Sequence, residues 1–354
     1  MLTIFIEPLL DVLGPLLQRR EDEDTAPNAT NATIARLDER IAAQLDALMM
    51  TGGAGLSSFM NDDTHVLAVV AAWTASSDPA DHARAWTYLT ESDWSSANLL
   101  MGVVMRHGGA AWRQYARSQS HKVLAAVFGE LPAPIAWLDH DAPVIRTWAW
   151  RHLAATRTQT STQTSTQSST PTDAQVAAAI ADPLTQEACI TYLCQQRDAR
   201  LPRILLAHVQ WSARLAERED AGAVSEILWA APANYPGLAS LGRVADVDRL
   251  IEVLAHPDPA QAIAAGIAVT QMTGADIASQ QRVMLPVAEG EDPAFADDAW
   301  LPDQQRAQQA WRDLKPKLGD AWRIARGYRI EDSEHPELPR SARRDLLLRR
   351  CRAG

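Results

Sequence analysis

A recurring helix start constrains the fold of this chain more than any other feature. An aspartate one or two residues before an apolar helical segment marks starts at Pro143, Pro183, Ala221 and Pro259, which are separated by 40, 38 and 38 residues. The aspartate side chain accepts from free N–H groups at a helix N-terminus, and proline suits the first helical position because it lacks the donor that would be unpaired there. Four evenly spaced starts therefore predict repeated helical units, and Pro79 predicts a further start upstream, off the regular step.

A second apolar segment in each unit predicts a partner helix, over residues 132–140, 200–209 and 247–256. Neither helix of such a pair can bury its apolar stripe alone, so stacking of neighbouring pairs is the stable arrangement. The unit length is typical of HEAT-type repeats. Strand signals are scarce, since the chain has only four Phe and five Tyr and no sustained alternation of β-branched residues. We therefore predict an all-α fold, a HEAT-like α-solenoid of stacked helical hairpins with a helical C-terminal extension.

The organisation along the chain predicts three parts. Residues 1–55 are expected to form N-terminal capping helices, residues 56–280 the repeat array, and residues 281–354 an acidic connector followed by C-terminal helices near 303–314 and 319–326. Inside the array, the tract over 156–173 is rich in Ser, Thr and Gln and predicts a low-complexity loop. A tolerated insertion explains this composition, and a segment that binds partners or is phosphorylated is the alternative.

The segment HPDPAQAIAAGIAVTQMTGADI (256–277) could be a phosphate-binding loop or the end of a helix. Asp258 and Pro259 fit a capped helix start, and Gly274 fits a helix end with positive φ. A phosphate cradle needs a glycine-rich turn followed by Lys and Ser or Thr, which is missing here. We predict that Thr-Gly-Ala-Asp ends a helix.

The charge balance narrows the classes of partner. The formal net charge is −11, with 44 acidic and 33 basic side chains. This balance disfavours non-specific binding to nucleic acid and anionic membranes, and it favours either basic partners or plain solubility. The three cysteines form no metal pattern, so we expect a reducing compartment and two buried thiols at Cys189 and Cys194. The apolar N-terminal segment has no basic residue before it, contains Pro8 and Pro15, and is not expected to be a signal peptide; a cytoplasmic protein without a membrane span is the consistent expectation.

Catalytic patterns are not visible. The nine histidines form no close metal pair, and His140 and His256 occupy equivalent repeat positions, where capping or turn packing explains them. The glycine run at 52–55 is not followed by Lys, and no nucleophile elbow is present. We expect no enzyme, metal or cofactor. The alternative is a helical-repeat enzyme such as a lyase or hydroxylase, which would need clustered His and Glu.

Tryptophan and acidic residues supply the candidates for partner binding. Most of the twelve tryptophans are expected to fill the core, but Trp148 and Trp150 are two residues apart in one helix, which predicts that one of them is exposed. An exposed tryptophan is a common anchor for partners. The acidic segment before the C-terminal helices adds a charged cluster. The candidate partner-binding residues are Glu289, Glu291, Asp292, Asp297, Asp298 and Trp300.

Four segments together resemble a known family. They are LDERIAAQLDALMMTGGAG (37–55), LAHPDPAQAIAAGIAVTQMTGADI (254–277), WLPDQQRAQQAW (300–311) and RSARRDLLL (340–348). In order and spacing they resemble an uncharacterised bacterial family distantly related to HEAT repeats, whose genes often lie in or beside type VI secretion clusters. The tract at 157–172 departs from the tighter connection usual in that family.

The resemblance implies a role in a secretion system and gives no catalytic residues. It implies a soluble accessory of a toxin-delivery system, so the expected function is that of a cytoplasmic immunity protein that binds and neutralises a secreted effector toxin. An adaptor or chaperone for effector loading is the near alternative, and a structural scaffold of the secretion apparatus is a third.

Overall fold

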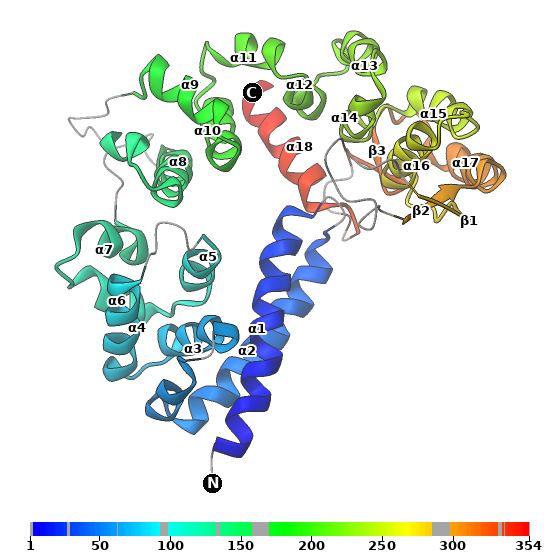
Figure 1. The fold of residues 1–354 in the computed structure, drawn as a ribbon. Helices are drawn as coiled ribbons and strands as arrows, with labels where there is room; N and C mark the ends of the chain where they lie inside the picture. Colours follow the sequence, from blue (N-terminus) through cyan, green and yellow to red (C-terminus); the bar gives the residue numbers. More distant parts are fainter. Residues whose placement is uncertain are drawn as a thin grey trace. The chain divides into compact units, whose positions relative to one another are not determined.

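The computed structural model describes residues 3–26, 29–61, 63–92, 98–131, 135–157, 170–284, 298–331, 335 and 337–353. In this part of the chain the structure is predominantly helical, with eighteen α-helices and two short two-stranded sheets (Figure 1). The predicted all-α character is confirmed at this level, although the strands were not predicted. The chain divides into two compact units, residues 1–26 with 33–196, and residues 27–32 with 197–354. This division falls inside the predicted array.

The first unit contains ten α-helices and two 3₁₀ turns in its described residues. In chain order they are α1 (Thr3–Thr25), α2 (Asn31–Thr51), η1 (Gly53–Phe59), α3 (Asp63–Ala75), α4 (Pro79–Glu91), α5 (Asn98–His107), α6 (Ala110–Arg117), α7 (Lys122–Gly129), η2 (Ile135–Asp139), α8 (Pro143–Arg157), α9 (Asp173–Ala181) and α10 (Pro183–Gln195).

The second unit contains the remaining helices and both sheets. In chain order its elements are α11 (Leu201–Ala207), α12 (Val209–Leu215), α13 (Ala221–Trp229), η3 (Pro232–Asn234), α14 (Tyr235–Leu241), η4 (Val244–Asp246), α15 (Val247–Val253), α16 (Pro259–Thr273), β1 (Ala278–Met284), β2 (Asp298–Pro302), α17 (Gln304–Leu318), β3 (Ile324–Ala325), β4 (Tyr328–Arg329) and α18 (Arg340–Ala353). Residues 27–32 join this unit through an isolated bridge between Thr30 and Pro339.

The predicted helix starts are confirmed. Helices α4, α8, α10, α13 and α16 begin at the five expected positions. Three of these helices have an aspartate whose side chain accepts from the N–H two residues further on, at 2.9–3.0 Å; these residues are Asp78, Asp182 and Asp258. Asp220 stands before α13 without a side-chain cap bond. The predicted end at Gly274 is also confirmed, since this residue has φ 74° and its N–H donates to Thr270.

The predicted partner helices are confirmed in part. Segments 200–209 and 247–256 contain α11 and α15. The described residues of segment 132–140 form the 3₁₀ turn η2 instead, and residues 132–134 lie outside the described part. Of the low-complexity tract, residues 158–169 also lie outside it. The first residues of the tract belong to the end of α8. At the other end of the tract, Thr172 and Gln175 form a capping box at the start of α9.

One predicted C-terminal helix is wrong. Helix α17 confirms the helix expected near residues 303–314, but residues 319–326 are not helical. Gly319 ends α17 with φ 59°, and the chain then forms β3 and β4 around a two-residue turn in which Arg326 and Gly327 have φ 50° and 81°. Positive φ at both turn residues matches the twist of paired strands, so this segment forms a hairpin.

The expectation that Trp148 or Trp150 is exposed is wrong. Trp148 and Trp150 are both buried, at 5% and 0% exposed. Helix α8 has neighbours on two sides: the Trp148 ring centroid lies 5.7 Å from that of Trp137 on η2, and the Trp150 centroid lies 5.6 Å from that of Tyr192 on α10. Side chains on different faces of one helix are therefore both covered. The two thiols Cys189 and Cys194 are buried, as expected, and neither is in a disulfide.

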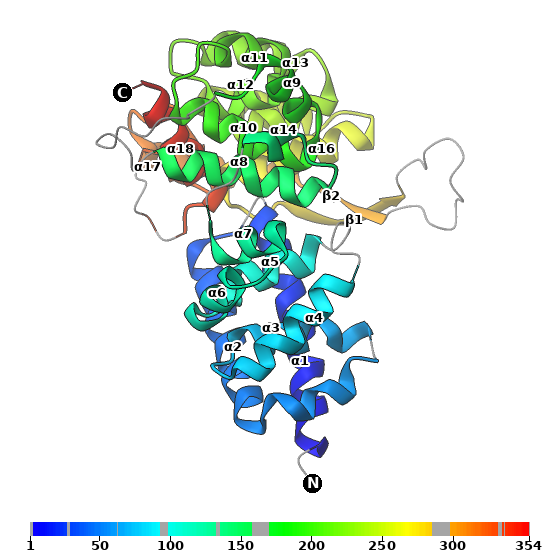
Figure 2. The same ribbon diagram turned by 90° about the vertical axis from the view of Figure 1, so that its left-hand side faces the viewer.

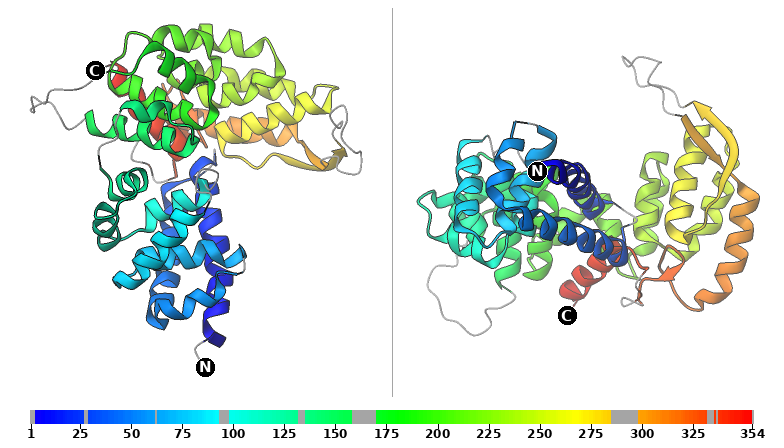
Figure 3. Two further views of the ribbon diagram at one scale, coloured as in Figure 1. Left: turned by 60° about the vertical axis from the view of Figure 1, so that its left-hand side comes forward. Right: turned by 90° about the horizontal axis from the view of Figure 1, so that it is seen from below.

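The core of the second unit is formed by α14, α15 and α16, with α17 against them. Leu238, Leu250 and Val269 are almost fully buried there, and Trp311 of α17 is 3% exposed. Figure 3 shows α17 beside α15 and α16, with the β1–β2 hairpin close to the same helices. This core supports the hairpin described next.

Candidate partner-binding site on the β1–β2 hairpin

The structure describes only part of the predicted partner-binding set. Glu289, Glu291, Asp292 and Asp297 lie outside the described residues. Asp298 is the first residue of β2, and its side chain is also outside the description. Trp300 lies in the middle of β2. The site is therefore built from Trp300 and its neighbours on the hairpin.

The register of the hairpin determines which side chains share a face. Arg282 pairs with Trp300, and Met284 pairs with Asp298. Residues two apart in a strand point to the same face, so Arg282, Met284 and Trp300 lie on one face. The guanidinium carbon of Arg282 is 4.1 Å from the centroid of the Trp300 ring, which places the cation over the ring.

This face, which we call the Trp300 face (Arg282, Met284 and Trp300), is accessible to solvent. Trp300 is 46% exposed and Met284 is 71% exposed. The two strands extend beyond the helices of the second unit (Figure 2). Arg282 and Met284 were missed in the sequence because the alternation of Arg282-Val283-Met284 is too short to predict a strand.

The base of the hairpin is fixed to the helices. Gly266 of α16 lies against Pro302, and a Cβ at this position would be 2.9 Å from the Pro302 Cβ. The Asp303 N–H donates to the Ile277 carbonyl at 2.6 Å, and the Asp303 side chain caps α17 by accepting from the Arg306 N–H. Arg306 in turn donates to the Ala278 carbonyl at 2.7 Å. The base is held from both strands, so the Trp300 face has a rigid support.

A hollow of about 590 Å³ opens at this base. Three residues of β1, Ser279 to Gln281, bulge between the pairs Ala278–Pro302 and Arg282–Trp300 and line it. Leu254, Pro257 and Leu301 give it apolar walls, and His256, Asp303 and Arg306 add polar groups. Apolar walls with a few polar groups are typical of a ligand-binding hollow.

The repeat-equivalent histidines are turn residues, as expected. His140 Nδ1 accepts from the Ala142 N–H at 3.0 Å, and His256 Nδ1 accepts from the Asp258 N–H at 3.1 Å. In both places the ring closes the turn before a helix start. Among the residues that the structure describes, no group of three or more His, Cys, Asp or Glu is placed to hold a metal ion.

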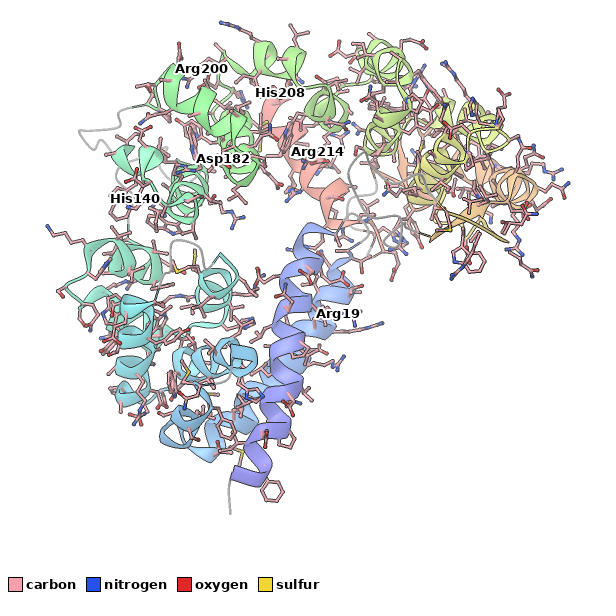
Figure 4. All side chains as sticks on the ribbon, viewed as in Figure 1. Arg19, His140, Asp182, Arg200, His208 and Arg214 are labelled. Carbon is pink, nitrogen blue, oxygen red and sulfur yellow. The ribbon has the colours of Figure 1, made fainter. Side chains whose placement is uncertain are left out.

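An arginine links two successive helix starts in the first unit. Arg146 donates to the His140 carbonyl at 2.8 Å and to the Asp182 carboxylate at 2.9 Å. His140 and Asp182 are labelled in Figure 4, where they lie at the starts of α8 and α10. Burial alone would raise the pKa of Asp182, but hydrogen bonds from Arg146 and from the Leu184 N–H outweigh it and lower the pKa. This contact is structural, since it fixes the two starts to each other.

No family model, curated protein or solved structure matches the chain. Over the described residues, no helix has both the length and the apolar character needed to cross a membrane.

Proposed function

We propose that this protein is a non-catalytic, protein-binding accessory of a type VI secretion system. Its specific role in the proposal is that of a cytoplasmic immunity protein that binds and neutralises a secreted effector toxin. The secretion setting comes from the sequence resemblance. The protein-binding role rests on one observation, the half-exposed Trp300 held under Arg282 on a supported hairpin.

The composition of the Trp300 face favours protein binding. Tryptophan and arginine are enriched among the residues that contribute most to binding energy, and methionine is enriched at interfaces. Here all three occur together on one face of a hairpin whose base is fixed. Because Arg282 already orients the indole, less side-chain freedom is lost when a partner covers it.

The charge of the chain and the acidic residues near the site fit a basic partner. The formal net charge of −11 would steer a basic toxin surface toward the protein. The predicted residues Glu289, Glu291, Asp292, Asp297 and Asp298 belong to the segment that joins the two strands or begins the second one. In the proposal this acidic segment contacts basic groups of the toxin. The hollow at the hairpin base accepts a side chain of the toxin.

A HEAT-like stack of helical hairpins is the architecture we propose for the scaffold. Its support is that alternate helices pack together, as equivalent helices of successive pairs do in a stack. In the first unit α3 contacts α5, α4 contacts α6 and α8 contacts α10, and in the second unit α12 contacts α14 and α14 contacts α16.

The test is co-expression with the effector toxin that the proposal places in a neighbouring gene. We expect the protein to restore growth and to co-purify with the toxin, and we expect Trp300→Ala and Met284→Ala to weaken the complex by at least about tenfold. The matched control is Leu206→Ala, which truncates another exposed apolar side chain of the same unit, 88% exposed on α11.

Two results would contradict the proposal. Growth that is not restored by the wild-type protein rules out the immunity role. If the Trp300→Ala variant binds the toxin as tightly as the Leu206→Ala variant does, the Trp300 face is not the binding site. Restoration of growth in cells without a working secretion apparatus distinguishes immunity from effector loading.

A further inference from the structure

Helix α1 of the first unit is apolar on two faces. One face packs into the unit and has four side chains that are at most 2% exposed, those of Ile6, Leu10, Leu13 and Leu17. The opposite face is open to solvent, since Phe5 is 66% exposed and Val12 is 43% exposed. A helix that is apolar all round is normally buried on all sides. Within the described part of the chain, the second face of α1 therefore lacks a covering partner.

The exposed residues form one stripe along the helix, which we call the α1 stripe. Its apolar members follow the spacing of three, four and seven residues that defines one helical face; they are Phe5, Pro8, Leu9, Val12 and Pro15. Arg19 continues the line, with a side chain that is 62% exposed. Figure 4 labels this residue on α1. From Phe5 to Arg19 the stripe extends about 21 Å, because a helix rises about 1.5 Å per residue.

The order of residues along the α1 stripe is symmetric about Val12. Phe5 and Arg19 are each seven residues from Val12, and Leu9 and Pro15 are each three residues from it. When two identical chains meet about a two-fold axis, residue i contacts residue j and residue j contacts residue i. Two antiparallel copies of α1 that cross at Val12 therefore place apolar residues against apolar residues, and Arg19 of each copy beside Phe5 of the other.

The charge of Arg19 favours the antiparallel arrangement. Within its own chain this side chain makes an ion pair with Glu23 at 3.9 Å and stays largely exposed. A guanidinium is attracted to the face of an aromatic ring, so Arg19 of one copy is attracted to Phe5 of the other. In a parallel pair the two Arg19 side chains would lie opposite each other, and like charges repel. The antiparallel pair also opposes the two helix dipoles.

Acidic residues beside the stripe disfavour an anionic membrane as its partner. Glu7 and Asp22 are exposed, and Asp11 is also exposed while it binds His65 of α3 at 2.8 Å. Anionic lipid headgroups would repel these carboxylates. Helical geometry directs all three acidic side chains at least about 80° around the helix from Val12. They therefore border a contact centred on Val12 without entering it.

We propose that the α1 stripe is the contact between two copies of this chain, in a two-fold antiparallel pair that crosses at Val12. Covering Pro8 and Pro15 costs little entropy, because a proline side chain has no rotamer freedom to lose. A single stripe of this length buries less surface than a standard interface of about 1,600 Å². The pair is therefore weak, with a dissociation constant in the micromolar range or above.

The first test is the mass of the full chain in solution, measured by sedimentation equilibrium between about 1 and about 500 µM. We expect the mass of one chain, 38.7 kDa, at the lowest concentration and a rise toward twice that mass at the highest. Val12→Glu places two like charges at the crossing point, and Phe5→Ala removes the ring beside Arg19. Each should weaken the pair by at least about tenfold.

The matched controls are Leu184→Glu and Leu184→Ala. Leu184 is 51% exposed on α10 of the same unit and lies outside the α1 stripe. Neither control should change the dependence of mass on concentration. All four substitutions are at exposed positions, and circular dichroism checks that each variant is folded.

Cysteine cross-linking tests the geometry. In a chain that also carries Cys351→Ser, to remove the partly exposed native thiol, Val12→Cys should form a disulfide between two copies under mild oxidation. Identical residues at a two-fold axis can approach within the reach of a disulfide, about 7 Å between Cα atoms. Phe5→Cys is the control, because in the antiparallel pair its two copies are about 21 Å apart. Mixing the Phe5→Cys and Arg19→Cys chains should restore a cross-link.

Three results would overturn this proposal. They are a mass that stays at that of one chain at every concentration, a Val12→Glu variant that pairs as tightly as Leu184→Glu, and a Phe5→Cys variant that cross-links as well as Val12→Cys. Binding of the single chain to phosphatidylcholine vesicles, lost in Phe5→Ala, would assign the stripe to a lipid surface instead. None of these results bears on the toxin-binding role, because the α1 stripe and the Trp300 face belong to different units and share no residue.

Discussion

Two tryptophans show how differently the helical and hairpin regions use the same side chain. Trp150 on α8 is fully buried against Tyr192 of α10, whereas Trp300 on β2 is 46% exposed and contacts Arg282 of the neighbouring strand. Helix α8 has a neighbour on each of two faces, so its large side chains become core. A hairpin fixed only at its base leaves one face uncovered, so the same side chain is available to a partner.

Replacement of these two residues by alanine should separate the two roles. Trp150→Ala removes a fully buried ring, and we expect the free energy of unfolding to fall by about 3–5 kcal/mol. Trp300→Ala removes a half-exposed ring and one cation–π contact, so we expect a loss below about 1 kcal/mol. Urea unfolding followed by far-UV circular dichroism measures both.

A conservative variant controls for ring size. Trp150→Phe keeps an aromatic ring against Tyr192 and should restore most of the stability that Trp150→Ala loses. If Trp150→Ala and Trp300→Ala had similar effects on unfolding, the distinction between core and contact tryptophan would be wrong.

Buried polar groups also differ between the two units. In the first unit, burial lowers the pKa of His107 to about 4, the charges of Arg106 and Arg20 lower it further and Asp38 opposes them, so the ring is neutral at pH 7. In the second unit Arg349 stays charged despite its burial. A histidine can lose its charge near neutral pH when it is buried, whereas an arginine keeps it and requires a partner.

This difference predicts acid sensitivity for the first unit. The pKa of His107 is about 4 in the folded state and 6.5 for the ordinary ring, so between these values the unfolded chain binds the proton and the folded chain does not. The free energy of unfolding should therefore be unaffected by His107 above pH 6.5. As the pH falls from 6.5 to about 4, it should decrease by up to about 3 kcal/mol. Urea unfolding at pH 7, 5.5 and 4.5 measures this loss.

His107→Gln provides the control, because glutamine does not titrate. The part of the pH dependence that comes from His107 should disappear in this variant. An unchanged slope between pH 6.5 and 4.5 would show that the ring is not held neutral by its surroundings.

The elements that the sequence predicted are those with local causes. A capping aspartate, a proline at the first helical position and a glycine at the end act within a few residues, so α10 and α16 could be located from their own segments. The hairpins could not, because a strand needs a partner strand. The sequence predicted a helix over 319–326, but a turn at Arg326 and Gly327 pairs β3 with β4 instead.

The residues of the Trp300 face differ in the same way. Trp300 could be named as a candidate from the sequence, because an aromatic residue beside an acidic segment is a recognisable feature. Arg282 and Met284 could not, because they share a face with Trp300 only through the pairing of β1 with β2. A site assembled from distant segments has no local pattern.

The helix starts allow the finest comparison, because equivalent aspartates differ in what they bind. Asp182 caps α10 and also binds Arg146. Within the described part of the chain, Asp258 caps α16 without a cation, and Asp220 makes no cap bond. A lost cap bond costs about 1 kcal/mol, and a lost ion pair of this exposure adds less than about 1 kcal/mol. Replacement by alanine, measured by urea unfolding, should therefore be most destabilising at Asp182, intermediate at Asp258 and smallest at Asp220. If Asp220→Ala were as destabilising as Asp258→Ala, the equal spacing of these starts, rather than their cap bonds, would explain why aspartate recurs.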